Sequence, residues 1–452
     1  MSRAERRKLK KAFKKDMIEF LKVQHHFLPN FIDELGRIKD PRHQSYTEYD
    51  IEEILYTVIM KNACSLISMQ DMTDEFNEDE RTHNLCLILG KEEKEFLPHY
   101  VTINECLERL DPLELEKFRN KMIKKLLRKR SFEDSRFLGK YWTVIVDATQ
   151  LFHFNKKHCE HCLKRTVKKG KEGERTYYYH NVLEAKIVLG ENLIVSIATE
   201  FIENEKEDVD KQDCERKAFK RLAKKLKKAY PRLPICILGD SLYACAPVFQ
   251  ICKENQWEYL IRYKDGSIPT LACDYHSIID MGEGEGRERN EEKEYKRKVR
   301  ESIKYKMKWV SNLYHEGHEV TVMELKIETN GEDSGDFQWV TGLQIRGKTA
   351  WEFAKVGRTR WKIENEGFNI QKNYRYEIEH ANSLNCNAMK NHYLLTQLAD
   401  LLLQLYENGV KGLRDVKRTI KKISSDLLKS LDEQLTREDI FHTKKRTSFS
   451  IP

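Results

Sequence analysis

Two short apolar runs in this chain each end in an aspartate, and a third acidic residue follows much later in a helical segment. Residues 142–147 read WTVIVD, and residues 233–240 read LPICILGD. The three acids are Asp147, Asp240 and, within the motif RTRWKIENEGF, Glu364. Active sites in open sheets form where strands end. The pattern therefore predicts that two strand tips and one helix bring three carboxylates together.

The periodicity around these runs predicts a mixed sheet. Alternating or β-branched apolar residues indicate strands, and apolar residues three or four apart indicate helices. In chain order we expect strands at 142–148, 177–189 and 192–201, a helix at 211–230, a strand at 233–238, a helix at 241–253 and a strand at 257–262. Such an order gives an α/β (α+β mixed) sheet with helices on its faces. It resembles the ribonuclease-H-like core.

Changes of pattern along the chain predict four regions. Apolar residues recur at helical spacing near both ends, and a polar stretch at 281–292 reads as a loop between strand-like runs at 307–313, 319–329 and 337–345. The expected regions are a helical N-terminal region at 1–135, the ribonuclease-H-like core at 136–264 and 348–400, a β-rich insertion at 265–347, and a C-terminal helical region at 401–452 that is a candidate for dimerisation.

The charge distribution favours a polyanionic partner. The 452 residues include 81 Lys and Arg against 73 Asp and Glu, and the basic residues cluster at 6–15 and 124–130. Clustered basic side chains suit nucleic acid, although a solvated helix face explains most such runs when each is taken singly.

Cysteine usage and hydropathy indicate an intracellular protein. Eleven scattered cysteines, often within apolar stretches, argue against a disulfide framework and favour a reducing compartment. The first residues are charged and carry no apolar signal region. The most apolar helical stretch, 393–405, is interrupted by Gln397, Asp400 and Gln404, so we expect no membrane span. The sequence predicts a soluble, cytoplasmic protein.

Three converging carboxylates suit phosphodiester chemistry. An aspartate that follows an apolar run often only begins a turn or caps a helix, so neither aspartate is decisive alone. Together with the strand order, however, they suggest a metal site. Two divalent ions about 4 Å apart activate an oxygen nucleophile and neutralise the leaving oxygen. Because Mg²⁺ prefers carboxylate oxygens, we expect Asp147, Asp240 and Glu364 to bind Mg²⁺, with Mn²⁺ as an alternative.

The segment around Glu364 resembles the C-terminal signature of the DDE-type (cut-and-paste) transposases of bacterial insertion sequences. That signature runs Tyr, two residues, Arg, three residues, Glu, six residues, Lys, and Arg360 and Glu364 match its Arg and Glu. The motifs VDAT at Asp147 and GDSLYA at Asp240 resemble the first and second acidic motifs of the family. The resemblance extends over roughly residues 140–400. It implies Mg²⁺-dependent nicking of transposon ends, after which the freed 3′ hydroxyl attacks the other strand or the target.

The chain departs from this signature at two positions. Gly357 stands where the family has Tyr, and Gln371 stands where it has Lys, with Lys372 one residue later. Both roles are therefore open. Glu366 lies close to Glu364 and is a rival for the third acid.

Basic and aromatic residues near the third acid are candidates for DNA contact. The expected set is Arg358, Arg360, Lys362, Lys372 and Trp339. Residues of the insertion in this transposase class help to seat a flipped base, and Trp339 and Trp309 are candidates to stack on it. Burial in the core is the alternative for either tryptophan. For Arg360, a helix-stabilising salt bridge with Glu364 is the alternative to a phosphate contact.

A cysteine and histidine cluster at 153–162 (HFNKKHCEHC) is half of a zinc motif. Cys159 and Cys162 have the spacing of a zinc knuckle, and His153 or His158 could add a third ligand. A fourth ligand is not apparent from the sequence, and a polar loop near the active site is the alternative.

Taken together, the motifs predict a DNA transposase. Its partners would be the inverted-repeat ends of the element and target DNA, bound by a homodimer associated with the nucleoid, with the N-terminal helices contacting the ends. A ribonuclease-H-like nuclease without strand transfer and a domesticated, non-catalytic DNA-binding protein are the two alternatives.

Overall fold

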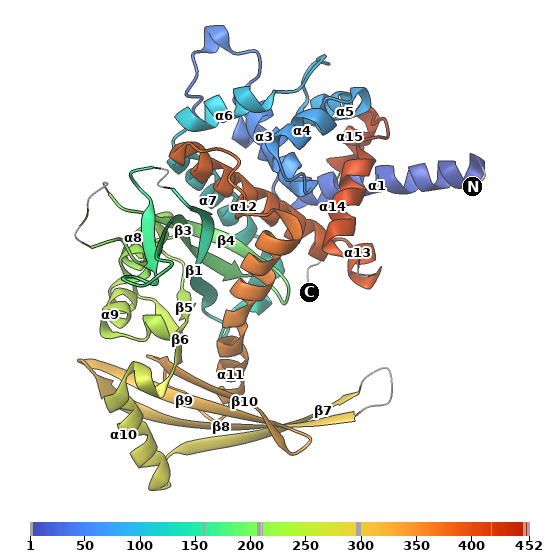
Figure 1. The fold of residues 1–452 in the computed structure, drawn as a ribbon. Coiled ribbons are helices and arrows are strands. Elements are labelled where there is room, and N and C mark those ends of the chain that lie inside the picture. Colours follow the sequence, from blue (N-terminus) through green and yellow to red (C-terminus); the bar gives the residue numbers. More distant parts are fainter. Residues whose placement is uncertain are drawn as a thin grey trace.

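A computed structural model describes residues 3–156, 159–205, 209, 211–294, 300–416, 418–445 and 449. Helices from both ends of the chain pack together on one side of a central sheet, and a β-rich extension projects from the opposite end of the molecule (Figure 1). Among the described residues, no helix is long and apolar enough to cross a membrane.

The central strands have the order expected for a ribonuclease-H-like sheet. In space they run β4–β3–β1–β5–β6, where β4 pairs with β3. Strand β3 pairs antiparallel with both β1 and β4. Strand β5 pairs parallel with both β1 and β6. The bounds are β1 Trp142–Phe154, β3 Arg175–Val188, β4 Ile194–Ile202, β5 Ile235–Gly239 and β6 Glu258–Tyr263. The predicted mixed α/β fold class is confirmed.

Two helices connect the parallel strands. Helix α8 (Glu215–Ala229) lies against β4 and buries an apolar stripe that includes Phe219 and Leu222. Helix α9 (Ala246–Asn255) begins later than expected, because residues Ser241–Tyr243 form a separate 3₁₀ turn and Pro247 lies in the first turn of α9. The predicted start of this helix at residue 241 was therefore wrong. The side chain of Asp240 caps the 3₁₀ turn instead.

The insertion continues the central sheet. Strand β10 pairs antiparallel with β6, and β9, β8 and β7 follow in order, so the core and the insertion share one sheet. The elements are α10 Pro269–Asp280, β7 Glu285–Glu294, β8 Arg300–His315, β9 His318–Thr329 and β10 Glu332–Thr341. The prediction of a loop over 281–292 was wrong, because β7 covers most of it. This strand pairs only with β8, and charged side chains are typical of an edge strand.

A short hairpin strand was also missed. The lysine-rich connection after β1 contains β2 (Leu163–Val167), which pairs antiparallel with β3. Three of its five side chains are exposed, so it has little apolar signal.

The helices of the two chain ends form one body. Helix α12 (Cys386–Gly409) packs against N-terminal helices and β4, and almost all of its residues are buried. The N-terminal helices are α1 Arg3–Phe27, α2 Phe31–Leu35, α3 Ile51–Ala63, α4 Met69–Phe76, α5 Asp79–Leu89, α6 Tyr100–Arg109 and α7 Pro112–Leu127, followed by a 3₁₀ turn at Arg130–Ser135. After α12 come α13 Lys411–Val416, α14 Ile420–Ser430 and α15 Arg437–Thr443.

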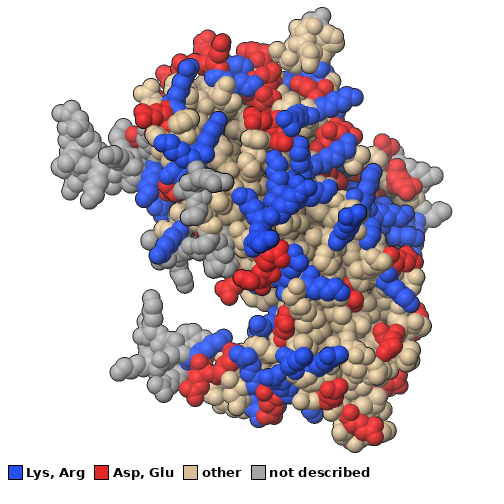
Figure 2. All heavy atoms as spheres, turned by 180° about the vertical axis from the view of Figure 1, so that it is seen from behind, with Lys and Arg blue, Asp and Glu red and all other residues tan. Residues whose placement is uncertain are grey.

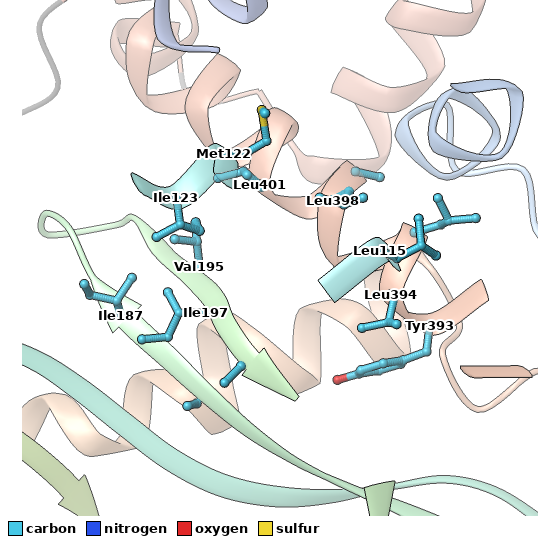
Figure 3. Close-up of a cluster of buried hydrophobic side chains, with 14 of the residues drawn as sticks. Leu115, Met122, Ile123, Ile187, Val195, Ile197, Tyr393, Leu394, Leu398 and Leu401 are labelled. Atoms are coloured by element: carbon cyan, nitrogen blue, oxygen red, sulfur yellow. The ribbon is translucent and has the colours of Figure 1, made fainter. Parts of the chain in front are cut away.

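Apolar side chains from three layers meet between the sheet and these helices (Figure 3). Leu115 and Ile123 of α7, Val195 of β4, and Leu394 and Leu398 of α12 are all buried there. Burying such aliphatic side chains contributes roughly 1.5–3 kcal/mol each. Helix α12 passes through residue 400, where the sequence predicts a domain boundary, and that boundary stays a prediction.

Candidate active site

The register of two parallel strands brings the two aspartates together. Ile145 of β1 lies opposite Leu238 of β5. Asp147 follows Ile145 by two residues within β1, and Asp240 follows Leu238 by two residues, directly after β5 ends at Gly239. Neighbouring strands are about 4.8 Å apart, so Asp147 and Asp240 lie side by side. The prediction that Asp147 stands at a strand tip was wrong, because β1 continues to Phe154. The Oδ1 atom of Asp240 accepts a hydrogen bond from the Leu242 amide at 2.9 Å, so the expected turn-capping role is also present.

Arg360 connects Glu364 to Asp147. The guanidinium Nη1 of Arg360 donates to Glu364 Oε1 at 2.7 Å and lies 3.6 Å from Asp147 Oδ2. Both acids therefore flank one cation. The salt bridge that was the alternative for Arg360 is present, and it also joins the first acid to the third.

The backbone that carries Glu364 is not a regular α-helix. After α11 (Ala350–Arg358), the chain forms a 3₁₀ turn at Thr359–Trp361 and then π-helical turns at Ile363–Phe368 and Gln371–Arg375. Short π-helical turns are frequent at functional sites.

The environment of Asp147 raises its pKa to about 7. Burial is the largest cause, since the apolar surroundings disfavour the charged form. Arg360 opposes the shift, while the carboxylates of Glu364 and Glu215 add to it.

Glu215 is a fourth acid that the sequence did not single out. It begins α8 and accepts a hydrogen bond from the Tyr243 hydroxyl at 2.7 Å. Burial raises its pKa, and the neighbouring Asp240 raises it further. In the sequence it is only the first residue of an amphipathic helix, and nothing local distinguishes it from the acidic residues that ordinarily begin helices.

The two glutamates of the third motif have different partners. Glu364 pairs with Arg360 beside Asp147, whereas Glu366 pairs with Lys362 at 3.3 Å. Lys362 also donates to the Glu191 carbonyl. The electrostatic influence on Asp147 comes from Glu364. These contacts favour Glu364 over Glu366 as the third acid.

The structure gives a reason for glycine at the signature Tyr position. A Cβ atom at Gly357 would overlap the indole ring of Trp339, which packs directly on the glycine. Trp339 is 1 % exposed and stacks on Phe337 with ring centroids 5.9 Å apart. This burial, and that of Trp309, supports the core alternative. Base stacking by Trp339 stays a prediction that would require its ring to leave this packing.

We expect Gly357→Ala to lower the free energy of unfolding by about 1–3 kcal/mol, because the added methyl group overpacks a buried aromatic contact. Chemical denaturation of the purified variant measures this. Gly412→Ala is the matched control, because an added Cβ at this helical glycine meets open space and should be neutral or slightly stabilising. Equal effects of the two substitutions would contradict the packing explanation.

Gln371, which stands at the Lys position of the signature, has a structural role. The Gln371 side chain is fully buried and donates to Gln397 at 3.1 Å and to Asp400 at 2.9 Å, so it ties the π-helical segment to α12. Lys372 pairs with Glu379 at 2.7 Å. Arg358 lies over the Phe337 ring, 5.6 Å from its centroid.

The cysteine pair lies in a separate cluster at the far end of β1. The thiols of Cys159 and Cys162 are 3.5 Å apart, and each is 3.4 Å from Nε2 of His180. His153 is not in this cluster: it is exposed, and it neighbours Phe152, the residue of β1 that pairs with His180. Successive residues of a strand face opposite sides. His158 lies outside the described residues.

A mixed sheet of this order, with aspartates carried by two adjacent central strands, places the chain in the class of ribonuclease-H-like proteins. Within this class, the chain matches the family model described as "Transposase DDE domain" over residues 138–399, and the model described as "DDE_Tnp_1-associated" over residues 32–122. The chain therefore belongs to the DDE transposase family. No curated protein matches it.

Proposed function

We propose that this transposase cuts the ends of its element and joins them to target DNA, using divalent metal ions bound by Asp147, Asp240 and Glu364. The observation that supports this most is the convergence of Asp147 and Glu364 on Arg360, beside the strand tip that carries Asp240. Membership of the family supports DNA as the substrate.

The donor set fits Mg²⁺ or Mn²⁺. Its ligand atoms are carboxylate oxygens, which are hard donors that such ions prefer. Burial is the main cause of the raised pKa of Asp147, and the neighbouring carboxylates of Glu364 and Glu215 add to it; a bound cation would offset both effects. Two bound ions would supply an activated oxygen nucleophile and stabilise the leaving oxygen of the phosphodiester.

The remaining groups would position the DNA. Arg360 balances the acids in the free protein, and it would contact a backbone phosphate once the metal ions replace it as partner of the carboxylates. Arg358, Lys362 and Lys372 are proposed as further phosphate contacts.

Basic side chains extend well beyond the acids. Lysine and arginine gather over a broad area of the face turned away in Figure 1, and the molecule is hollowed beside the β-rich insertion (Figure 2). Exposed lysines also line α7 and α8, among them Lys121, Lys124 and Lys220. We propose that DNA follows these surfaces, that the N-terminal helices recognise the ends, and that a homodimer acting at the nucleoid holds two ends together.

Strand transfer separates this proposal from a simple nuclease. We expect wild-type protein with Mg²⁺ to cut DNA carrying the inverted repeats that flank its gene, and to join pre-cut ends with a free 3′ hydroxyl to a target plasmid. Cleavage without joining would favour the nuclease alternative. DNA binding with neither reaction would favour the domesticated protein.

Asp147→Asn should stabilise the metal-free protein at pH 8. The pKa of Asp147 in the folded state, about 7, exceeds the ordinary value of 3.8. Ionisation of this group therefore lowers stability progressively as the pH rises from about 4 to 7, and the full cost is present at pH 8. We expect a gain on the order of 2 kcal/mol at pH 8 and little at pH 4.5, measured by chemical denaturation without added divalent metal. A gain that is equal at both pH values would contradict the raised pKa.

A further inference from the structure

The cysteine and histidine cluster at the far end of β1 has the dimensions of a metal site. Cys159 and Cys162 flank a tight turn in which the Cys159 amide lies 3.4 Å from the Cys162 sulfur. His180 of β3 directs Nε2 between the two thiols. The three ligand atoms all lie within 4.8 Å of one another. Three soft or borderline donors from two segments therefore converge.

The distances match tetrahedral zinc. Zinc lies about 2.3 Å from a thiolate sulfur and about 2.0–2.1 Å from an imidazole nitrogen, so tetrahedral ligands are separated by about 3.5–3.8 Å. The separations here are 3.4, 3.4 and 3.5 Å.

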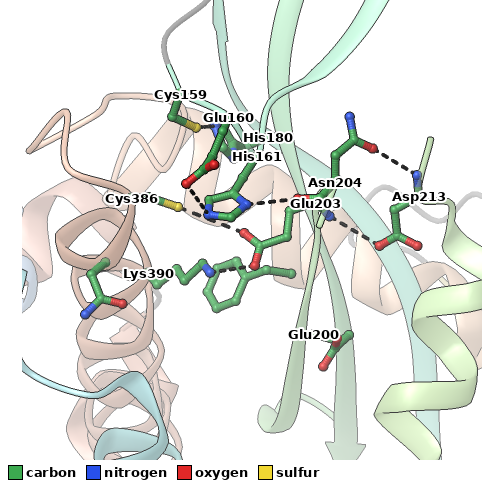
Figure 4. A network of polar contacts seen from close by, with 12 residues as sticks. Cys159, Glu160, His161, His180, Glu200, Glu203, Asn204, Asp213, Cys386 and Lys390 are labelled. Carbon is green, nitrogen blue, oxygen red and sulfur yellow. Dashed lines mark hydrogen bonds and ion pairs between the residues drawn. The ribbon is translucent and has the colours of Figure 1, made fainter. Parts of the chain in front are cut away.

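A fourth donor comes from a distant part of the chain. Cys386 is the first residue of α12, and its thiol interacts with that of Cys159. The sulfur of Cys386 lies outside the group of three whose ligand atoms are within 4.8 Å of one another. It is 4.0 Å from a carboxylate oxygen of Glu203, and Figure 4 marks this contact.

We propose that Cys159, Cys162, His180 and Cys386 bind one structural zinc ion. The set of three thiolates and one imidazole is a common composition of closed, four-coordinate zinc sites. Each thiol loses its proton on binding. No position is left for a substrate or an activated water, so this ion would have no part in the cleavage chemistry.

The site would join three segments that are remote in sequence. Cys159 and Cys162 lie in the connection between β1 and β2, His180 lies in β3, and Cys386 begins the helix that packs under the sheet. Near the ion, Lys390 of α12 pairs with Glu203 at 2.6 Å, which joins the same helix to the end of β4. The zinc would therefore tether the β1–β3 hairpin, whose first strand carries Asp147, to α12.

The full-length protein, purified without chelators and in the presence of reductant, should contain about one zinc per chain by elemental analysis. A Cys159→Ser/Cys162→Ser variant should contain none. Cys273→Ser is the matched control, because this cysteine is exposed on α10 and far from the cluster in sequence and in fold; it should retain the full zinc content. The absence of zinc from wild-type protein supplied with zinc, or its retention by the double variant, would overturn the proposal.

Cobalt substitution tests the fourth ligand and does not depend on the stability of the double variant. Wild-type protein loaded with Co²⁺ should show the absorption of a tetrahedral site with thiolate charge transfer. In Cys386→Ser the charge-transfer intensity should fall by about one third, from three thiolates to two. An unchanged spectrum would exclude Cys386 as a ligand. Titration that finds two thiols fewer than the eleven cysteines, without bound metal, would indicate a disulfide and would also overturn the proposal.

Discussion

Replacement of Asp240 by alanine should reduce Mg²⁺-dependent cleavage of end-containing DNA by about 10³-fold or more, which corresponds to a loss of roughly 4 kcal/mol of transition-state stabilisation. Asp147→Ala should have an effect of the same size, because both side chains leave adjacent parallel strands at equivalent positions. DNA binding, measured by gel shift, should change little, since the removed groups are anionic and do not attract phosphate.

The third acid offers a matched pair of substitutions. Glu364→Gln should be as inactive as the aspartate variants, whereas Glu366→Gln should keep most of the activity because its side chain pairs with Lys362 away from Asp147. If Glu366→Gln is inactive and Glu364→Gln is active, the assignment of the third acid is reversed. Full activity of Asp147→Ala or Asp240→Ala would remove the metal-site assignment.

Arg119→Met should be the most destabilising of the substitutions considered, by about 3–5 kcal/mol, because it leaves a buried carboxylate without its main compensating cation. Arg119 of α7 is 2 % exposed and donates to Ser196 at 2.8 Å and to Thr199 at 2.5 Å. Both hydroxyls donate in turn to Glu184, which is fully buried. Chemical denaturation measures the loss.

Two further variants separate this network from a general effect on α7. Lys117→Met, on the exposed face of the same helix, should change stability little, because its pair with Glu114 is at the surface. Adding Glu184→Gln to Arg119→Met should recover part of the loss, since the uncompensated charge is then absent. No recovery would show that the cost arises from packing and not from charge.

The sequence was sufficient for the order of the core strands and for placing Asp147 and Asp240 on neighbouring strands; the role of these two acids with Glu364 stays a prediction. Short apolar runs that end in Asp147 and Asp240 have a strong local pattern, and parallel pairing then brings their ends together. Strand β7 was missed because an edge strand with charged side chains lacks that pattern. Glu215 was missed because its approach to the acids depends on how α8 packs, which no local signal encodes.

The ligands of the cysteine cluster could likewise be predicted only where they are close in sequence. Cys159 and Cys162 were recognisable from their spacing, because one turn brings both thiols together. His180 and Cys386 lie 18 and 224 residues beyond Cys162 and meet it only through the pairing of β1 with β3 and the packing of α12. The expected histidine ligands were those nearest in sequence, and the alternation of side chains along β1 directs His153 away from the cluster.

Exchange of a metal ligand tests the central claim most directly. Asp240→Cys should be inactive with Mg²⁺, which binds thiolate poorly, and should regain measurable cleavage with Mn²⁺, which accepts softer ligands. Wild-type protein and Glu366→Cys should cut with either ion. Cleavage of end DNA by Asp240→Cys at the wild-type rate in Mg²⁺, or the same residual rate with both ions, would contradict the proposal that Asp240 binds the catalytic metal.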